Sequence, residues 1–173
     1  ADGSSKFSPN NHWGYFPAGA FAWRISDEPF LESSKGWLDN LKLRLSYGTS
    51  GADNIDPSLW KETWTTSTIT TDGKTSTVYK PAGMLSNPDL KWETTVSRNI
   101  GVDFGFWNNR LYGSLDAYWN STKDLLMEVP IDETTGYSYQ FQNIGKTSNK
   151  GFELSLNGTV HLEERLKYSF QML

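Results

Sequence analysis

Apolar and polar residues alternate with a period of two along much of this chain, and that pattern constrains its fold more than any other feature. It is clearest at residues 41–47, where three leucines and a tyrosine alternate with Lys42, Arg44 and Ser46. Successive side chains of a β-strand point to opposite faces, so such a segment predicts a strand with one apolar and one polar face. The same alternation recurs near residues 14–25, 40–48, 92–107, 110–122, 149–160 and 166–173.

The alternation also assigns side chains to faces of the predicted sheet. We expect one face to carry Leu41, Leu43, Leu45, Phe104, Leu115, Leu154 and Leu156, and the other to carry Lys42, Arg44, Asp103, Asp116 and Glu153. One charged residue breaks the rule, because Arg98 falls on the apolar face of its segment.

The connections between these segments have unequal lengths. Asn108 and Asn109 predict a tight turn, and 161–165 predicts a second short turn. Residues 26–40 form a short connection in which Pro29 favours one helical turn. The connections 49–91 and 123–148 are instead long, polar and rich in turn residues. Short turns that alternate with long loops are typical of outer-membrane β-barrels, whose long loops face the outside of the cell. The sequence therefore predicts an all-β, antiparallel up-and-down meander.

Large aromatic residues fall at particular heights along the predicted strands. If strand directions alternate, four of them share the end of the long loops and two share the other end. The four are Tyr15, Tyr47, Trp92 and Trp119, and the two are Trp23 and Phe106. Aromatic girdles at both membrane interfaces predict this sorting, although Trp and Tyr also favour strands in general.

Composition excludes several other classes of protein. No apolar run is long enough for a transmembrane helix, and mean hydropathy is −0.57. The formal net charge of −4 argues against a partner nucleic acid, and the absence of Cys excludes disulfides and thiolate metal ligands. The last predicted strand continues to Leu173, which favours a segment of a longer chain over a complete domain.

Several stretches resemble, in order along the chain, the SusC/RagA family of TonB-dependent outer-membrane transporters. They are Asp2-Gly3-Ser4-Ser5-Lys6-Phe7, Trp13-Gly14-Tyr15-Phe16-Pro17 with Ala22-Trp23-Arg24-Ile25, Leu41 to Gly48, Asn87-Pro88-Asp89-Leu90-Lys91-Trp92-Glu93, Asn108-Asn109-Arg110-Leu111, Thr122-Lys123-Asp124-Leu125-Leu126, and Asn143-Ile144-Gly145 followed by Asn149-Lys150-Gly151-Phe152-Glu153-Leu154.

The resemblance implies that residues 1–173 are later strands of a 22-stranded transmembrane β-barrel in the bacterial outer membrane. It implies import of oligosaccharides or peptides. It implies three kinds of partner: a SusD-like surface lipoprotein, the lipid bilayer, and the TonB complex through regions outside this sequence.

The sequence offers no convincing catalytic, metal or cofactor site. Gly145-Lys146-Thr147-Ser148 resembles the end of a phosphate loop, but Gln140 stands where the earlier glycine belongs. His12 and His161 are isolated and lack metal-ligand spacing. The adjacent carboxylates at 132–133 and 163–164 fall in connections, where solvated charge is the simplest interpretation. We therefore expect no enzyme activity.

Aromatic residues in the long loops are the candidates for ligand binding. They are Trp60, Trp64, Tyr79, Tyr137, Tyr139 and Phe141. Aromatic rings stack on sugar rings at a low entropic cost, but the same rings also pack loop against loop or loop against a partner. The main alternative to a transporter segment is a soluble carbohydrate-binding β-sandwich with these rings as its platform. A secreted enzyme domain is a third alternative, which the missing nucleophile disfavours.

Overall fold

The computed structural model describes residues 1–162 and 166–172, and in it most of the chain is β-strand. The strands are β1 (Asp2–Gly3), β2 (Trp13–Gly14), β3 (Ala18–Arg24), β4 (Leu38–Ala52), β5 (Trp64–Thr71), β6 (Lys74–Pro81), β7 (Met84–Leu85), β8 (Glu93–Phe106), β9 (Leu111–Pro130), β10 (Tyr139–Leu162) and β11 (Leu166–Met172). Three short 3-10 segments complete the fold: η1 (Ile25–Asp27), η2 (Pro29–Ser34) and η3 (Glu133–Thr135). None of the helical segments in the described chain has the length and apolar character needed to cross a membrane.

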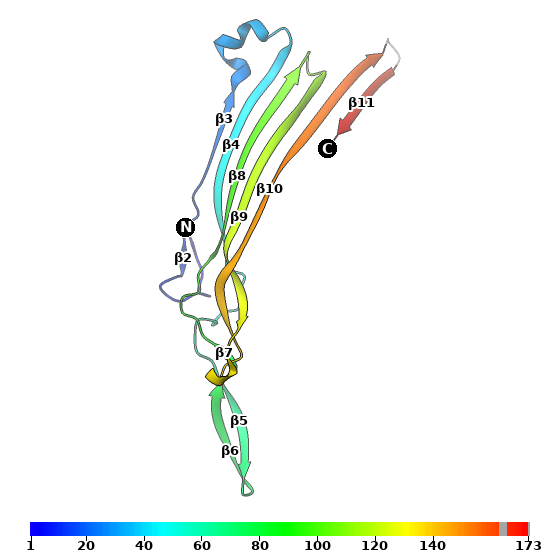
Figure 1. Ribbon diagram of the computed structural model, residues 1–173. Helices are drawn as coiled ribbons and strands as arrows, with labels where there is room; N and C mark the ends of the chain where they lie inside the picture. The colour runs from blue at the N-terminus through cyan, green and yellow to red at the C-terminus, as the bar shows by residue number, and fades with distance from the viewer. Residues whose placement is uncertain (163–165, 173) are drawn as a thin grey trace. The chain divides into compact units, whose positions relative to one another are not determined.

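The main sheet is an antiparallel meander with the strand order β11-β10-β9-β8-β4-β3, which confirms the predicted fold class. Figure 1 shows β3, β4, β8, β9 and β10 side by side in this sheet. The short strand β7 pairs in parallel with the start of β10, while β5–β6 and β1–β2 form separate two-stranded sheets. Neighbours in space are therefore neighbours in the chain, apart from the small strands inserted between β4 and β8.

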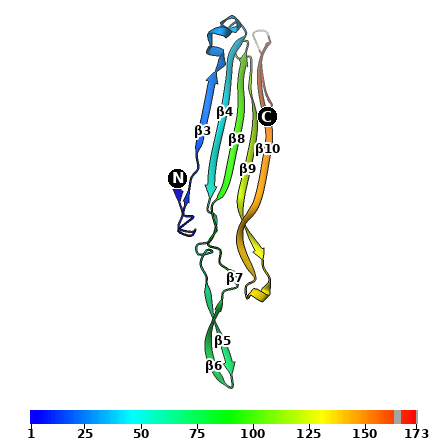
Figure 2. The ribbon, with the colours of Figure 1, turned by 60° about the vertical axis from the view of Figure 1, so that its left-hand side comes forward.

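The short connections form where the sequence predicts them. Asn108 and Asn109 both have positive φ, and the Arg110 amide donates to the Trp107 carbonyl at 3.2 Å, as in a two-residue hairpin loop. The 3-10 segment η2 begins at Pro29, whose fixed φ suits the first position of a helix. The 3-10 segments η1 and η2 both lie in the connection between β3 and β4 (Figure 2). The predicted turn at 161–165 lies partly outside the described residues, and the last residue, Leu173, lies outside them.

The long connections contain more structure than the sequence predicts, and the expectation of irregular loops is wrong there. Strand β9 continues to Pro130 and β10 starts at Tyr139, so most of 123–148 extends two strands of the sheet. Within 49–91, β5 and β6 form a hairpin whose tip, Asp72-Gly73, has two positive φ values. The hairpin is rich in threonine on both faces, which conceals the alternation but favours strand structure.

The chain divides into two compact units. We call residues 17–49, 96–121 and 148–173 the strand unit, and residues 1–16, 50–95 and 122–147 the loop unit. Strands β4, β8, β9 and β10 each contribute residues to both.

The strand unit presents its apolar side chains to the outside instead of covering them. Phe21, opposite Leu45 in the β3–β4 pair, is 56% exposed, Leu154 is 53% exposed and Phe152 is 82% exposed. A soluble β-sandwich would bury these side chains between two sheets, so the sandwich alternative is not favoured. An exposed apolar face of this extent is what a strand presents to lipid.

The loop unit has a small buried core that begins in the N-terminal segment. Phe7 and Leu90 are completely buried. The Phe7 and Phe16 rings contact the Trp92 ring at centroid distances of 5.4 and 5.5 Å. The Trp92 indole N–H donates to the His12 carbonyl at 3.3 Å. The sequence led us to expect Trp92 in an exposed aromatic girdle. That expectation is wrong, because Trp92 packs inside the loop unit.

The face assignment predicts how the intact protein responds to a charge on the apolar face. Replacing Leu43 or Leu154 with Arg should destabilise the protein by about 2–4 kcal/mol if these sites meet the middle of the bilayer. A denaturant titration of the protein folded in lipid vesicles measures this loss. Ser46→Arg on the opposite face of β4 is the matched control, and an equal loss in the control would refute the assignment.

Candidate functional site

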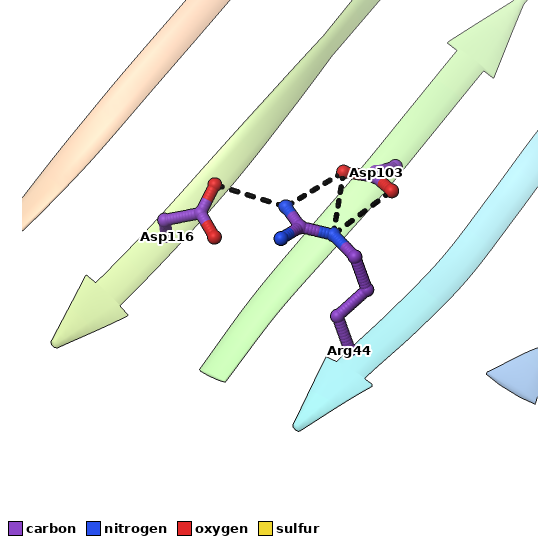
Figure 3. A network of polar contacts seen from close by, with 3 residues as sticks. All are labelled: Arg44, Asp103 and Asp116. Atoms are coloured by element: carbon purple, nitrogen blue, oxygen red, sulfur yellow. Dashed lines mark hydrogen bonds and ion pairs between the residues drawn. The ribbon is translucent and has the colours of Figure 1, made fainter. Parts of the chain in front are cut away.

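An ion-pair network joins three neighbouring strands on the polar face of the strand unit (Figure 3). Arg44 of β4 donates from Nε and Nη2 to Asp103 of β8 at 2.8–3.0 Å. Its Nη2 atom also donates to Asp116 of β9 at 3.0 Å. The Arg44 side chain is 34% exposed, and the two carboxylates are 27% and 20% exposed. The network places one cation between two anions on a partly hydrated surface.

A glycine makes room for this network. Gly101 lies in β8 beneath the guanidinium, and a Cβ atom there would collide with both Asp116 and Arg44. A side chain at this position would have to displace the ends of Arg44 and Asp116, so glycine allows the close approach of the guanidinium to the backbone. These contacts also place Arg44, Asp103 and Asp116 on one face, as the alternation predicts.

In the loop unit, Asn143 of β10 holds together the start of β8 and the middle of β9. Its side-chain amide donates to the carbonyls of Lys91 at 2.8 Å and Asp124 at 2.7 Å, and its oxygen accepts from the Lys91 amide at 3.0 Å. The Lys91 ammonium forms an ion pair with Asp124 at 3.0 Å. Asp124 itself has a φ of +60°, an uncommon conformation for a non-glycine residue. The side chain of Asn143 thus satisfies backbone groups that the irregular ladder leaves free.

Two of the six candidate aromatic residues lie on one face of the β5–β6 hairpin. Trp64 pairs with Pro81, and Tyr79 pairs with Thr66. Paired residues share a face, so Trp64 and Tyr79 are diagonal neighbours. Their side chains are 57% and 75% exposed. The remaining positions of that face are Thr68, Thr70, Thr75 and Thr77, so it carries rings and hydroxyl groups and no charge.

The other four candidates are engaged in contacts within the loop unit. Trp60 is half-buried and the ammonium of Lys61 lies 4.5 Å from the centre of its ring. Tyr137 donates from its hydroxyl to Glu62 at 3.1 Å, and this hydrogen bond to a carboxylate raises the pKa of Tyr137. Tyr139 and Phe141 are half-buried and meet edge to face at 6.0 Å. These contacts give the four rings a packing role, which leaves Trp64 and Tyr79 as the most available pair.

The bend that contains η3 is stabilised locally. The Thr134 amide donates to the Asp132 carboxylate at 2.9 Å, and this bond lowers the pKa of Asp132. The carboxylate at 132 therefore acts as a turn residue, in agreement with its interpretation as solvated charge. No group of His, Cys, Asp and Glu in the described part of the chain has the arrangement of a metal site.

Sequence reasoning from side-chain chemistry missed the residues that organise the loop unit. Ser4 donates to Asp53 at 2.7 Å, Ser8 donates to the Pro88 carbonyl at 2.7 Å, and Asn11 donates to the Leu90 carbonyl at 3.1 Å. Each of these three contacts has one partner in a stretch that carries the family resemblance. The resemblance was therefore a signal for this network, whereas composition and alternation were not.

The fold by itself defines a class of protein. A single meander with exposed apolar side chains on one face and ion pairs on the other is a segment of a membrane-spanning β-barrel. Residues 1–172 match the family model described as TonB dependent receptor-like, beta-barrel, and the chain belongs to that family. It is accordingly a segment of a bacterial outer-membrane barrel.

Several relatives support the assignment. The chain is 42% identical over 158 residues to TonB-dependent receptor P26 of Formosa agariphila, covering 91% of this chain and 16% of the relative. It is 40% identical over 160 residues to TonB-dependent receptor SusC of Bacteroides thetaiotaomicron, covering 90% of this chain and 16% of SusC. The chain thus spans about a sixth of the length of these relatives, which are receptors and not enzymes.

Solved structures agree with this family. The RagAB peptide importer in its closed-closed state matches 98% of this chain and 19% of its own, with a TM-score of 0.76 and 32% identity. In the open-open state the TM-score is 0.77 over 96% of this chain, with 31% identity. The likeness extends over both units of the chain.

The Arg44 network predicts a measurable coupling between strands. Arg44→Met leaves Asp103 and Asp116 without their shared cation, and we expect the intact protein to lose about 1–2 kcal/mol of stability. The pairing of Arg44 with Asp103 should appear as a coupling of about 1 kcal/mol in a double-mutant cycle with Asp103→Asn. Additive effects of the two substitutions would show that the contact contributes nothing.

The Asn143 contacts predict a local change in the loop unit. Asn143→Asp removes both donated hydrogen bonds and places a second carboxylate beside Asp124. We expect faster amide hydrogen exchange at residues 87–92 and 122–126 with little change in the strand unit. Asn54→Asp, an exposed change in the same unit, is the control. Unchanged exchange in the Asn143 variant would contradict the structural role.

Proposed function

We propose that the complete protein is a TonB-dependent transporter that imports oligosaccharides or peptides across the outer membrane, without catalysing a reaction. The observation that carries this proposal is the two-sided strand unit, with an exposed apolar face for lipid and a charged face for an aqueous lumen. The similarity to TonB-dependent receptor SusC and to the RagAB peptide importer supports a role in import.

A SusD-like surface lipoprotein is the proposed partner, with energy supplied by the TonB complex through regions outside this sequence. The resemblance to the SusC/RagA family implies such a lipoprotein, and the likeness to the RagAB peptide importer supports this proposal. By strand counting, the connections 53–92 and 131–138 join the same ends of the strands. We assign these connections to the cell exterior, because long barrel loops lie there.

The β5–β6 hairpin is the part of these connections that we propose meets substrate or partner. Trp64 and Tyr79 share an uncharged face with five threonines, and both rings are exposed. Rings flanked by hydroxyl groups suit a neutral, hydroxyl-rich ligand such as an oligosaccharide, because stacking and hydrogen bonding operate together. The same two rings would serve equally as anchors in a protein interface.

A pair of substitutions in the full-length transporter separates these roles. Trp64→Ala combined with Tyr79→Ala should lower uptake several-fold while the lipoprotein still copurifies, if the rings contact substrate. Loss of copurification would assign the rings to the partner interface instead. Trp60→Ala and Tyr139→Ala provide the comparison with the ring positions that are engaged in packing.

Ile69→Ala, on the opposite face of the same hairpin, is the matched control. It removes a side chain of similar exposure without touching the ring-bearing face. If the paired ring substitutions leave both uptake and complex formation at the control level, the hairpin face has neither function. Cell-surface labelling of a cysteine placed at Gly73 tests the proposed topology, and labelling from the periplasm only would refute it.

A further inference from the structure

Arg98 is a charged side chain on the mainly apolar face of the strand unit. Its guanidinium lies over the Tyr47 ring of β4 at 5.7 Å from the ring centre, which places both residues on this face. Arg98 is exposed, and the ion pairs of the described residues do not include it. A cation in this position needs an anionic or strongly polar partner, and the described residues supply no carboxylate in an ion pair with it.

The neighbours of Arg98 follow from the pairing of β8 with β9. The Arg110 amide donates to Trp107 in the hairpin turn, and the hydroxyl groups of Thr95 and Thr122 lie 2.8 Å apart farther along the same pair. In an antiparallel pair, each step forward along one strand is a step back along the other. Counting residues from the turn, or from the Thr95–Thr122 pair, therefore places Arg98 opposite Trp119. Trp119 also lines a shallow groove with Arg98 and Tyr47, and it is 43% exposed.

The next strand extends the row. Gly151 of β10 lies against the Tyr118 ring of β9, and the Thr159 amide donates to the Arg110 carbonyl at 2.8 Å. The same counting sets Lys150 opposite Trp119. Lys150 is exposed and lies on the apolar face, since Gly151 and Tyr118 occupy the other. One row across the four strands β4, β8, β9 and β10 therefore reads Tyr47, Arg98, Trp119, Lys150.

The rows beside this one differ sharply in character. The adjacent row toward the short turns is apolar and consists of Phe21, Leu45, Ile100, Ala117 and Phe152. The adjacent row toward the long connections reads Thr49, Val96, Ser121 and Ser148, so three of its four side chains carry a hydroxyl group. The cationic row thus lies at the boundary between apolar and polar surface, where a membrane interface meets a barrel.

A groove beside the row could hold part of an acyl chain. Gly19 of β3 pairs with Tyr47, and apart from its two chain neighbours no heavy atom of the described residues lies within 4 Å of the position a Cβ would occupy. The groove is lined by Gly19, Phe21, Leu45 and Ile100 and continues to Arg98. Apolar surface and a cation are therefore contiguous on the outward face.

We propose that Arg98 and Lys150, with Tyr47 and Trp119, bind the phosphate-bearing headgroup of an outer-leaflet lipid, whose acyl chain lies in the groove at Gly19. Arg and Lys are the side chains that recognise phosphate by charge-assisted hydrogen bonds. The two cations stand on strands separated by one other strand, about 9–10 Å apart at the backbone, which suits a headgroup with two phosphates. The row faces outward at the end of the sheet that we assign to the cell exterior, so the occupant is a lipid and not a soluble substrate.

The test measures lipid binding by the delipidated full-length protein in detergent. The probes are bisphosphorylated lipid A and the same lipid after removal of its phosphates, with bound lipid counted by native mass spectrometry. The variant with both Arg98→Gln and Lys150→Gln should bind the phosphorylated lipid about tenfold more weakly, and each single variant about threefold. Lys42→Gln, which removes a positive charge from the opposite face, should bind like the unmodified protein.

Three results would overturn the proposal. The first is equal binding of phosphorylated lipid by the double variant and the unmodified protein. The second is an equal loss of binding for the lipid without phosphates. The third is competition by inorganic phosphate at a concentration similar to that of the lipid. The heat-dependent migration of the barrel in gels checks that each variant is folded. The exchange of Arg98 for Lys and Lys150 for Arg keeps both charges, and it should retain binding if phosphate recognition is the cause.

Discussion

In the hydrocarbon of a bilayer, a backbone amide has no water to bond, so every membrane-spanning strand depends on its two neighbours for hydrogen bonds. This requirement explains why β3, β4, β8, β9, β10 and β11 form one uninterrupted meander. It also leaves the side chains free to differ between the two faces. A bilayer needs only about 9–11 residues of a strand. Since β9 has 20 residues and β10 has 24, both continue well beyond the hydrocarbon and carry the structure of the loop unit.

The two faces handle charge in different ways. On the polar face, Arg44 is neutralised within the protein by Asp103 and Asp116 across three strands. On the outward face, Arg98 and Lys150 have aromatic neighbours and no carboxylate of the chain in the row. On the polar face, the charge of Arg44 therefore needs no counter-ion from the aqueous lumen. The arrangement on the outward face makes the surface depend on what the membrane provides.

The sequence predicted the regular part of this structure because each strand there meets lipid on one face and water on the other. Apolar and polar residues therefore alternate along it. Residues 41–47 and 99–106 could be assigned to faces from their letters alone, and the Arg44 contacts agree. The extension of β9 could not be predicted, because Lys123 and Asp124 interrupt the pattern and Asp124 adopts a positive φ. The hairpin β5–β6 has threonine on both faces, and only Asp72-Gly73 signalled its turn. Among the site candidates, the rings were identifiable, but only the strand register shows that Trp64 and Tyr79 share a face.

The packing of Phe7 has a consequence for the order in which the chain folds. Phe7 and Leu90 are fully buried, and the hydrogen bonds that fix this segment join residues 79 and 80 positions apart in the chain. Closing such a long loop costs entropy that local strand pairing does not. The N-terminal segment therefore has to wait, with its aromatic side chains unprotected, until residues 88–92 have emerged and been placed by β8. During assembly, a chaperone or a protease can therefore reach this segment. It is expected to dock last, after residues 88–92 are in place.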